Sequence, residues 1–229
     1  MSELFSLQLQ NRQQQGRDGV WLDLPTTTEQ VQAALRQIGI SSDNPQGLFI
    51  SGYFAEEEKR FAIPYNMVLA SNVDELNFLA SRLETLSTGE RAELNAALQA
   101  PQSELFSIGR ITDFPENVDY YVHLPDVHGP AQLGDYYLNR SGMVDMPEEW
   151  KGGIDTAQFG RYVAQQEQGA FTQYGYLVKS GDEWQKVHEG QPVPEEYRVL
   201  SFPAPEVMRD AANIPPPVQT ETEPQKVIP

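Results

Sequence analysis

Residues 72–86, NVDELNFLASRLETL, carry the clearest signals of local structure in the chain, and these signals predict a helix. Asn72 suits the N-cap, and the Glu75 side chain three residues later can bind the backbone of that cap, as in a capping box. Four leucines recur at spacings of three and four and therefore share one helix face: Leu76, Leu79, Leu83 and Leu86. The sequence predicts an amphipathic helix whose acidic residues remain near water.

A second helix follows directly. Ser87 and Glu90 have the spacing of another capping box, and Pro101 ends the helical run. Two short helices joined by a tight turn predict a helical hairpin, which we assign to a central unit at residues 71–102.

The preceding residues, 1–70, have the pattern of a small α/β unit. Thr26 and Glu29 are spaced as a capping box, and Gly39 lies where a helix C-cap belongs. Alternating or continuous apolar runs predict three strands, at residues 4–10, 19–25 and 47–54, around this helix.

Residues 103–202 predict a third unit of α+β type. Strands are expected at residues 105–114, 117–127 and 197–202, helices at 131–142 and 156–169, and a hairpin at 174–187 around Ser180-Gly-Asp. Seven of the 27 residues at 203–229 are proline, which predicts a disordered tail. The expected fold is α+β: an elongated chain of three small units with a Pro-rich tail.

The net charge of the chain limits the kinds of partner that it can bind. The chain has 33 acidic and 16 basic residues, a net charge of −17, so it repels nucleic acid and anionic membranes and is attracted to basic surfaces. The acids are spread through structured sequence, with 16 of them in residues 101–200, rather than gathered in a tail. At one charge per ~1.7 Å of duplex DNA, this charge corresponds to roughly 29 Å of duplex.

Cysteine is absent, which excludes disulfides and thiolate chemistry. The N-terminal residues do not have the pattern of a signal peptide, and no apolar run approaches the length of a membrane span. These features predict a cytoplasmic protein without a membrane partner.

Candidate chemistry is sparse. His123 and His128 flank Asp126 in a turn without further metal ligands, and the paired carboxylates at 56–58 and 148–149 lie on expected exposed turns. The nucleophile-elbow, Walker A and dinucleotide-binding motifs are missing. We therefore expect no catalytic residues, no metal and no cofactor.

Several blocks resemble one family. GVWLDLPTTTEQVQAALRQIGI at 19–40 and IPYNMVLASNVDELNFLASRLETL at 63–86 are similar to the first two domains of ArdA-type antirestriction proteins. The likeness continues through VDYYVHLPDVHGPAQLGDYYLNRSGMVDMPEEWKGGIDTAQFGRYV at 118–163 and GAFTQYGYL at 169–177, and it spans roughly residues 4–178.

The resemblance implies DNA mimicry. Such proteins are elongated, commonly dimeric and acidic, occupy the DNA-binding groove of type I restriction–modification enzymes, and serve mobile elements that enter a restricting cell. A phosphate-like surface is expected from twelve carboxylates: Asp74, Glu75, Glu84, Asp113, Glu116, Asp119, Asp126, Asp135, Asp145, Glu148, Glu149 and Asp155.

The chain departs from the family pattern at one helix. Relatives often read D-Y-E-A-Y-G-R-D where this chain reads DTAQFGRY, so Asp155, Gly160 and Arg161 match but two acids are missing. Two alternatives stay open. One is a mimic aimed at another DNA-binding defence or nucleoid protein. The other is an enzyme whose site uses the Tyr, His and acidic residues of 103–202.

Overall fold

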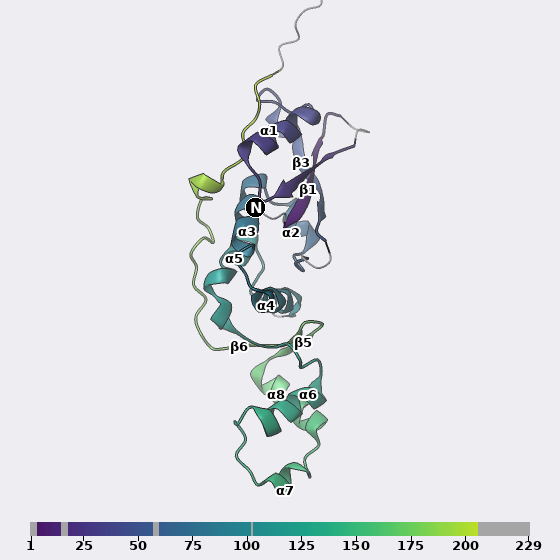
Figure 1. Cartoon of the computed structure of the whole chain (residues 1–229), viewed down its shortest axis with the longest axis vertical. Helices are drawn as coiled ribbons and strands as arrows, with labels where there is room; N and C mark the ends of the chain where they lie inside the picture. The colour runs from purple at the N-terminus through teal and green to yellow at the C-terminus, as the bar shows by residue number, and fades with distance from the viewer. Residues whose placement is uncertain (1–3, 15–17, 57–59, 102, 206–229) are drawn as a thin grey trace, which may run out of the picture.

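The computed structural model describes residues 4–14, 18–56, 60–101 and 103–205. It is a mixed α+β protein with two three-stranded sheets. Figure 1 shows an elongated body, with the N-terminal sheet towards one end and the second sheet further along. Three helices lie at the opposite end: α6 (Pro130–Asp135), α7 (Glu148–Lys151) and α8 (Thr156–Glu167). Of the tail predicted at 203–229, residues 206–229 lie outside the described residues, whereas Pro203 is buried against the body.

The three predicted N-terminal strands are confirmed: β1 (Phe5–Asn11), β2 (Val20–Leu24) and β3 (Leu48–Phe54). They form an antiparallel sheet in the order β2-β1-β3, with the 3₁₀ turn η1 (Pro45–Gly47) before β3. Leu7 and Leu22 are paired across the first two strands, and both are buried. Apolar alternation therefore sets one face of this sheet against the core.

Helix α1 (Thr28–Gln37) confirms the predicted helix, but its capping box uses Thr27 and Gln30, one residue later than expected. The tertiary structure explains the shift, because the Thr26 backbone N–H donates to the Asn77 side chain of another helix. Gly39 has a φ of 68°, as a C-terminal cap in the left-handed region requires.

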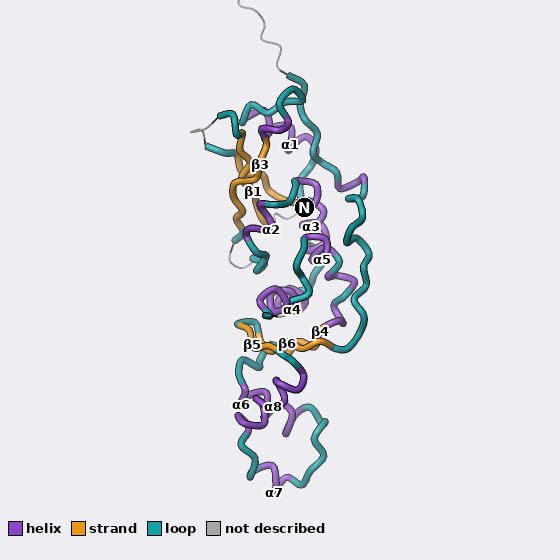
Figure 2. The backbone as a smooth tube through the Cα atoms, turned by 180° about the vertical axis from the view of Figure 1, so that it is seen from behind, coloured by secondary structure: helices purple, strands orange, loops and turns teal. Residues whose placement is uncertain are grey.

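The two central helices are also confirmed, with both predicted capping boxes: α3 (Val73–Leu83) and α4 (Thr88–Gln99). The short helix α2 (Tyr65–Leu69) precedes them. Their packing differs from the expected hairpin. Figures 1 and 2 show α4 crossing the direction of α3. Helix α4 contacts the second sheet, while α3 contacts β2 and the later helix α5 (Ile108–Thr112).

The strand predicted at 105–114 is wrong. This stretch forms α5 (Ile108–Thr112), followed by the 3₁₀ turns η3 (Phe114–Glu116) and η4 (Val118–Tyr120). Ser107 caps α5 by accepting the Arg110 backbone N–H at 3.2 Å. Because both Ile108 and Ile111 are buried on one side, their spacing of three belongs to a helix face rather than to a strand.

The second sheet consists of β4 (Tyr121–Leu124), β5 (Ala170–Thr172) and β6 (Gly175–Lys179), in the antiparallel order β4-β6-β5. The strand predicted at 117–127 is confirmed in its centre. The hairpin predicted at 174–187 is misplaced. Its first run forms β6, but β6 pairs with the earlier strands β4 and β5, and the second predicted run, after Ser180-Gly-Asp, forms no strand.

Between β4 and β5 the chain forms what we call the α6–α8 lobe, residues 125–169. It contains α6 (Pro130–Asp135), the π-helical turn η5 (Tyr136–Arg140), α7 (Glu148–Lys151) and α8 (Thr156–Glu167). The helices predicted at 131–142 and 156–169 are confirmed. A small core of Val127, Leu133 and Tyr176 joins the lobe to the second sheet.

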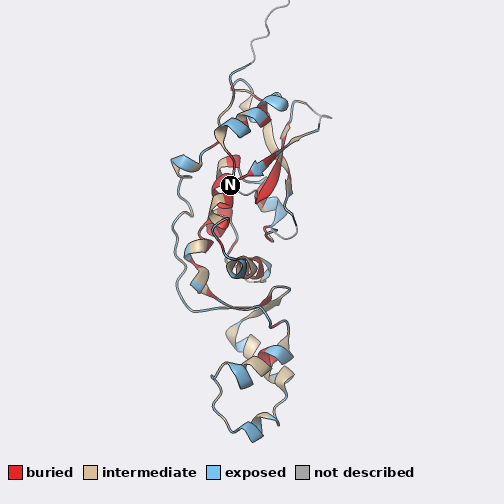
Figure 3. Ribbon diagram, in the orientation of Figure 1, coloured by how far each residue is buried: buried red, intermediate tan, exposed pale blue. Residues whose placement is uncertain are grey.

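A larger core extends from Leu4 to Val199 and includes buried side chains of both sheets. Figure 3 shows the buried residues concentrated along β1 and α3. The division into three units stays a prediction, since this core is shared by segments from all of them.

After β6 the chain returns along the body. We call residues 180–205 the strap. Figures 1 and 2 show it running from the second sheet past α5 and α3 towards α1. The strand predicted at 197–202 is wrong, because the strap contains the 3₁₀ turn η6 (Glu195–Tyr197), a turn at 189–190 and otherwise irregular chain.

Candidate functional site

The structure sorts the twelve predicted carboxylates by exposure. Seven are exposed: Glu116, Asp119, Asp126, Asp145, Glu148, Glu149 and Asp155. Four are half-buried: Asp74, Glu75, Glu84 and Asp135. One, Asp113, is fully buried.

The exposed members all come from one continuous segment. Residues 116–155 hold eight acidic and two basic residues and run from η3 through β4, α6 and α7 to the start of α8. In Figure 1 this segment covers the end of the molecule that carries the α6–α8 lobe. The exposed members of the predicted set therefore lie on one half of the elongated body.

Basic neighbours partly neutralise this surface. Arg82 pairs with Glu116, Arg140 with Asp135 at 3.1 Å, and Lys151 with Glu148 at 2.6 Å. Asp126, Asp145 and Glu149 have no ion-pair partner in the described part of the chain, so their charges face solvent. Exposed pairs contribute little energy and can exchange partners, because water screens them.

Two of the half-buried carboxylates have structural roles. Glu75 closes the capping box of α3, and its backbone N–H donates to Asn72 at 2.9 Å. Asp74 Oδ1 accepts the backbone N–H groups of Val199 and Leu200 at 2.8 and 2.7 Å. One carboxylate oxygen of Asp74 is thus hydrogen-bonded within the chain, to the strap.

Asp113 requires a correction. Its side chain is 0% exposed, and its two oxygens accept backbone N–H groups from Val187, His188 and Glu189 at 3.3, 2.6 and 3.1 Å. A carboxylate enclosed in this way cannot present charge to a basic partner. We therefore remove Asp113 from the predicted surface.

Asp155 combines both roles. It is exposed, and its Oδ1 accepts the Gln158 backbone N–H at 2.9 Å as the N-cap of α8. Gly160, also matched to the family pattern, lies where α8 crosses α6, whereas Arg161 points outward and is exposed. The three matched residues therefore have different roles: Asp155 caps a helix, Gly160 packs against another helix and Arg161 lies on the surface.

Sequence reasoning missed further exposed carboxylates. They lie in the N-terminal part and on the strap: Asp18, Asp23, Glu29, Asp43, Asp182, Glu183, Glu195 and Glu196. The strap pairs stand in polar, Pro- and Gly-containing sequence, which was a usable signal for exposure.

Glu93 on α4 was missed for a different reason. Burial, with the nearby charges of Glu90 and Asp119, raises the pKa of Glu93 to about 8. Its Oε1 has no hydrogen-bond partner within the described chain. Only the tertiary structure brings Asp119 near α4.

Several histidine and tyrosine side chains are engaged in structural contacts. The His123 ring nitrogen Nε2 lies 2.7 Å from the Tyr174 carbonyl oxygen, and the His188 ring packs edge-on against Phe78. Glu167 accepts hydrogen bonds from Tyr137 and Tyr176 at 2.6 and 3.0 Å. Burial, together with the contact to Glu167, raises the pKa of both phenols. Across the described ranges, His, Asp and Glu side chains form no group of three suited to a metal ion.

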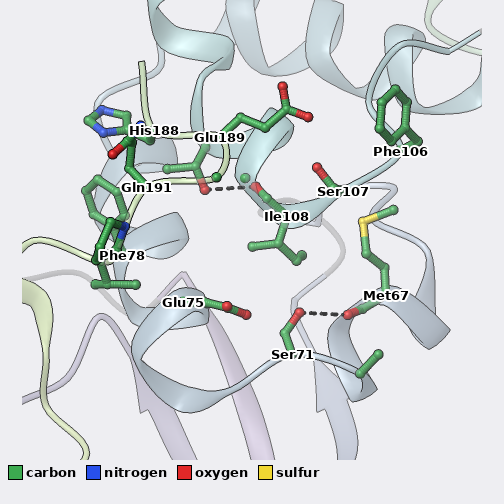
Figure 4. Close-up of a pocket in the computed structure, with 16 residues that line it drawn as sticks. Met67, Ser71, Glu75, Phe78, Phe106, Ser107, Ile108, His188, Glu189 and Gln191 are labelled. Carbon is green, nitrogen blue, oxygen red and sulfur yellow. Dashed lines mark hydrogen bonds between the residues drawn. The ribbon is translucent and has the colours of Figure 1, made fainter. Parts of the chain in front are cut away.

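A cavity of about 610 Å³ lies between α2, α3, α5 and the strap. Figure 4 shows Met67, Phe78, Phe106 and Ile108 around it, together with the carboxylates of Glu75 and Glu189. Glu189 is paired with Arg110, and Glu75 is held by its cap. The cavity is thus mainly apolar, and its acidic groups already have partners.

Among the described residues, no helix is both long enough and apolar enough to cross a membrane. In comparisons with known proteins, the sequence model of one family, described as antirestriction protein (ArdA), matches residues 15–178. No curated protein matches the chain.

Proposed function

Because the chain belongs to the ArdA family of antirestriction proteins, we propose that it inhibits restriction by acting as an acidic mimic of DNA. The proposed target is the DNA-binding groove of a type I restriction–modification enzyme. Inhibition is stoichiometric and non-catalytic, and it takes place in the cytoplasm, where such enzymes meet incoming DNA.

One observation carries this proposal: the exposed carboxylates of residues 116–155 are arrayed along one half of an elongated body. A basic groove that binds DNA neutralises a series of phosphates, and its affinity is a sum of many weak, salt-dependent contacts. The dispersed exposed acids supply charge of the same sign over an extended surface, which supports competition for such a groove.

We also propose a homodimer. Met143, Trp150 and Tyr162 are large exposed apolar side chains in the α6–α8 lobe. The presence of three such side chains in one lobe supports a contact between protein surfaces there. A dimer also doubles the length of acidic surface that one complex can present.

The proposal is tested by competition. A purified type I modification core is bound to labelled target DNA and titrated with the full chain at two salt concentrations. Displacement near one equivalent, weaker at higher salt, is the expected result. Absence of displacement at low salt rejects this target and directs the search to other basic DNA-binding defence or nucleoid proteins. Turnover at substoichiometric protein would instead indicate an enzyme.

A further inference from the structure

We infer that the strap, residues 180–205, sets the position of the acidic α6–α8 lobe relative to the N-terminal part, and that Asp113 and Asp74 are its positioning residues. The inference rests on the proposed function only for its consequence, which is the spacing of charge along the body. The strap lies beyond the residues matched by the family model, which end at 178. It is therefore an addition to the matched family region.

The first anchor of the strap is Asp113, at the end of α5. The buried carboxylate accepts three consecutive backbone N–H groups of the strap, at residues 187–189. Asn117 adds a two-way contact, since its amide accepts the Gln185 N–H at 2.7 Å and donates to the Gln185 carbonyl at 3.0 Å. Hydrogen bonds to an ionised group are stronger than neutral ones, so this anchor is tight.

Charged side chains reinforce the same anchor. The buried Arg110 guanidinium donates to Glu189 at 3.2 Å and to Glu104 at 2.9 Å. Glu104 in turn accepts from Lys179 at the end of β6, at 2.6 Å. The strap, α5 and the second sheet are thereby joined in one ionic network.

The second anchor lies on α3. Asp74 accepts the N–H groups of Val199 and Leu200, and the Asn77 side chain donates to the Tyr197 carbonyl at 3.1 Å. In both anchors an aspartate and an asparagine on the body bind backbone groups of the strap. Extended chain has unsatisfied backbone groups, and these side chains satisfy them.

The ends of the strap are fixed as well. The Ser180 N–H donates to the Tyr120 carbonyl beside β4 at 2.9 Å. At the other end, the Ser42 N–H donates to the Pro203 carbonyl at 2.9 Å, and Gln32 of α1 donates to Ser201 at 3.1 Å. One continuous segment therefore connects the second sheet, α5, α3 and α1, and limits the bending of the body between them.

The first test measures strap opening directly by hydrogen exchange. Asp113→Asn keeps the shape of the side chain but replaces one acceptor with an NH₂ group that faces amide donors. We expect the amides at 187–189 to exchange at least about tenfold faster, and Asp74→Asn to do the same at 199–200. The control, Asp119→Asn, removes the same charge from an exposed residue and leaves these amides unchanged.

The second test asks whether the anchor matters for inhibition. In DNA competition we expect Asp113→Asn to weaken displacement about tenfold, whereas Asp43→Asn, which removes one exposed charge outside residues 116–155, should weaken it less than about threefold. Equal losses in the two variants would overturn the positioning role and leave charge alone as the cause.

A disulfide provides rescue. A Cβ at Gly109 would lie 3.8 Å from the Cβ of Glu189, which is the usual Cβ separation in a disulfide. The unmodified chain has no cysteine, so an introduced pair has no competing thiol. In the Asp113→Asn background, Gly109→Cys with Glu189→Cys should restore displacement when oxidised and lose it when reduced. The cysteine pair with Asp113 intact is the matched control.

The two proposals fail separately. If the unmodified chain does not displace DNA, DNA mimicry of this target is rejected, while hydrogen exchange still decides whether the aspartates hold the strap. The strap inference is overturned if exchange at 187–189 is unchanged in Asp113→Asn. It is also overturned if oxidation does not restore displacement in the triple variant although the oxidised cysteine pair with Asp113 intact displaces DNA.

Discussion

Gly134 of α6 and Gly160 of α8 lie where the two helices cross, and neither position has room for a side chain. A Cβ at Gly160 would overlap the Pro130 carbonyl oxygen, and a Cβ at Gly134 would overlap the Thr156 carbonyl oxygen. The backbones of α6 and α8 are thus in direct contact. This crossing holds together the lobe that carries most of the exposed acidic segment.

Gly160→Ala should destabilise the lobe by about 2–3 kcal/mol, because the added methyl meets backbone that cannot rotate away. Urea unfolding followed by circular dichroism measures the change. Gly89→Ala in α4 is the control, since nothing lies within 4 Å of a Cβ there. It should be neutral or stabilising by up to about 1 kcal/mol. Equal stability of Gly160→Ala and the unmodified chain would contradict the direct backbone contact between α6 and α8.

Asn77→Ala should cost about 2–3 kcal/mol of unfolding free energy. The buried amide accepts the Thr26 N–H at 2.8 Å and donates to the Tyr197 carbonyl at 3.1 Å, so its loss leaves two backbone groups unsatisfied. Chemical denaturation checks the value. Asn139→Ala, which removes an exposed asparagine, should change stability by less than about 0.5 kcal/mol. Similar effects of the two substitutions would refute the bridging role.

Glu93 should make the fold less stable as pH rises. Its pKa in the folded chain, about 8, lies above that of an ordinary glutamate, so the folded state retains a proton that the unfolded state releases. Stability therefore falls between about pH 5 and pH 8.

Glu93→Gln should flatten that profile in thermal unfolding. The variant and the unmodified chain should match at pH 5, with the variant more stable by about 1 kcal/mol at pH 8. This free-energy difference is well below the one that the full pKa shift of Glu93 would give, because the side chain is half-buried and water screens its charge. Glu149→Gln on the surface is the control and should not alter the profile. A variant that remains as pH-sensitive as the unmodified chain would rule out Glu93 as the cause.

Neutralising a patch should abolish inhibition, whereas single substitutions should cost little. We expect a combined variant with four changes to displace DNA about a hundredfold less well, since four exposed charges at ~0.7 kcal/mol each act together. The changes are Asp126→Asn, Asp145→Asn, Glu148→Gln and Glu149→Gln. Competition titrations at two salt concentrations measure both the loss and the reduced salt dependence.

The matched control for this patch neutralises four exposed acids of the N-terminal part: Asp18→Asn, Asp23→Asn, Glu29→Gln and Asp43→Asn. Both sets remove the same net charge. An equal loss in the two would show that total charge, rather than the segment at 116–155, controls inhibition. Loss of activity from one Asp→Asn change in the patch would also contradict a distributed surface.

Where the signals are local, the sequence alone determined the structure. The capping boxes at Asn72 and Ser87 depend on partners three residues away, and the strand and helix patterns depend on alternation or on spacings of three and four. The family was likewise identifiable, because its motifs recur in order along the chain. These features require no knowledge of distant contacts.

Tertiary structure decided which carboxylates serve the surface and which serve the fold. Asp113 and Asp119 look alike in sequence, yet the first is enclosed by backbone about 75 residues further along the chain and the second faces water. The pairing of β4 with β6 and the course of the strap depend on similarly distant partners. A charged group becomes structural only when other segments supply its hydrogen bonds, and local sequence does not encode where those segments lie.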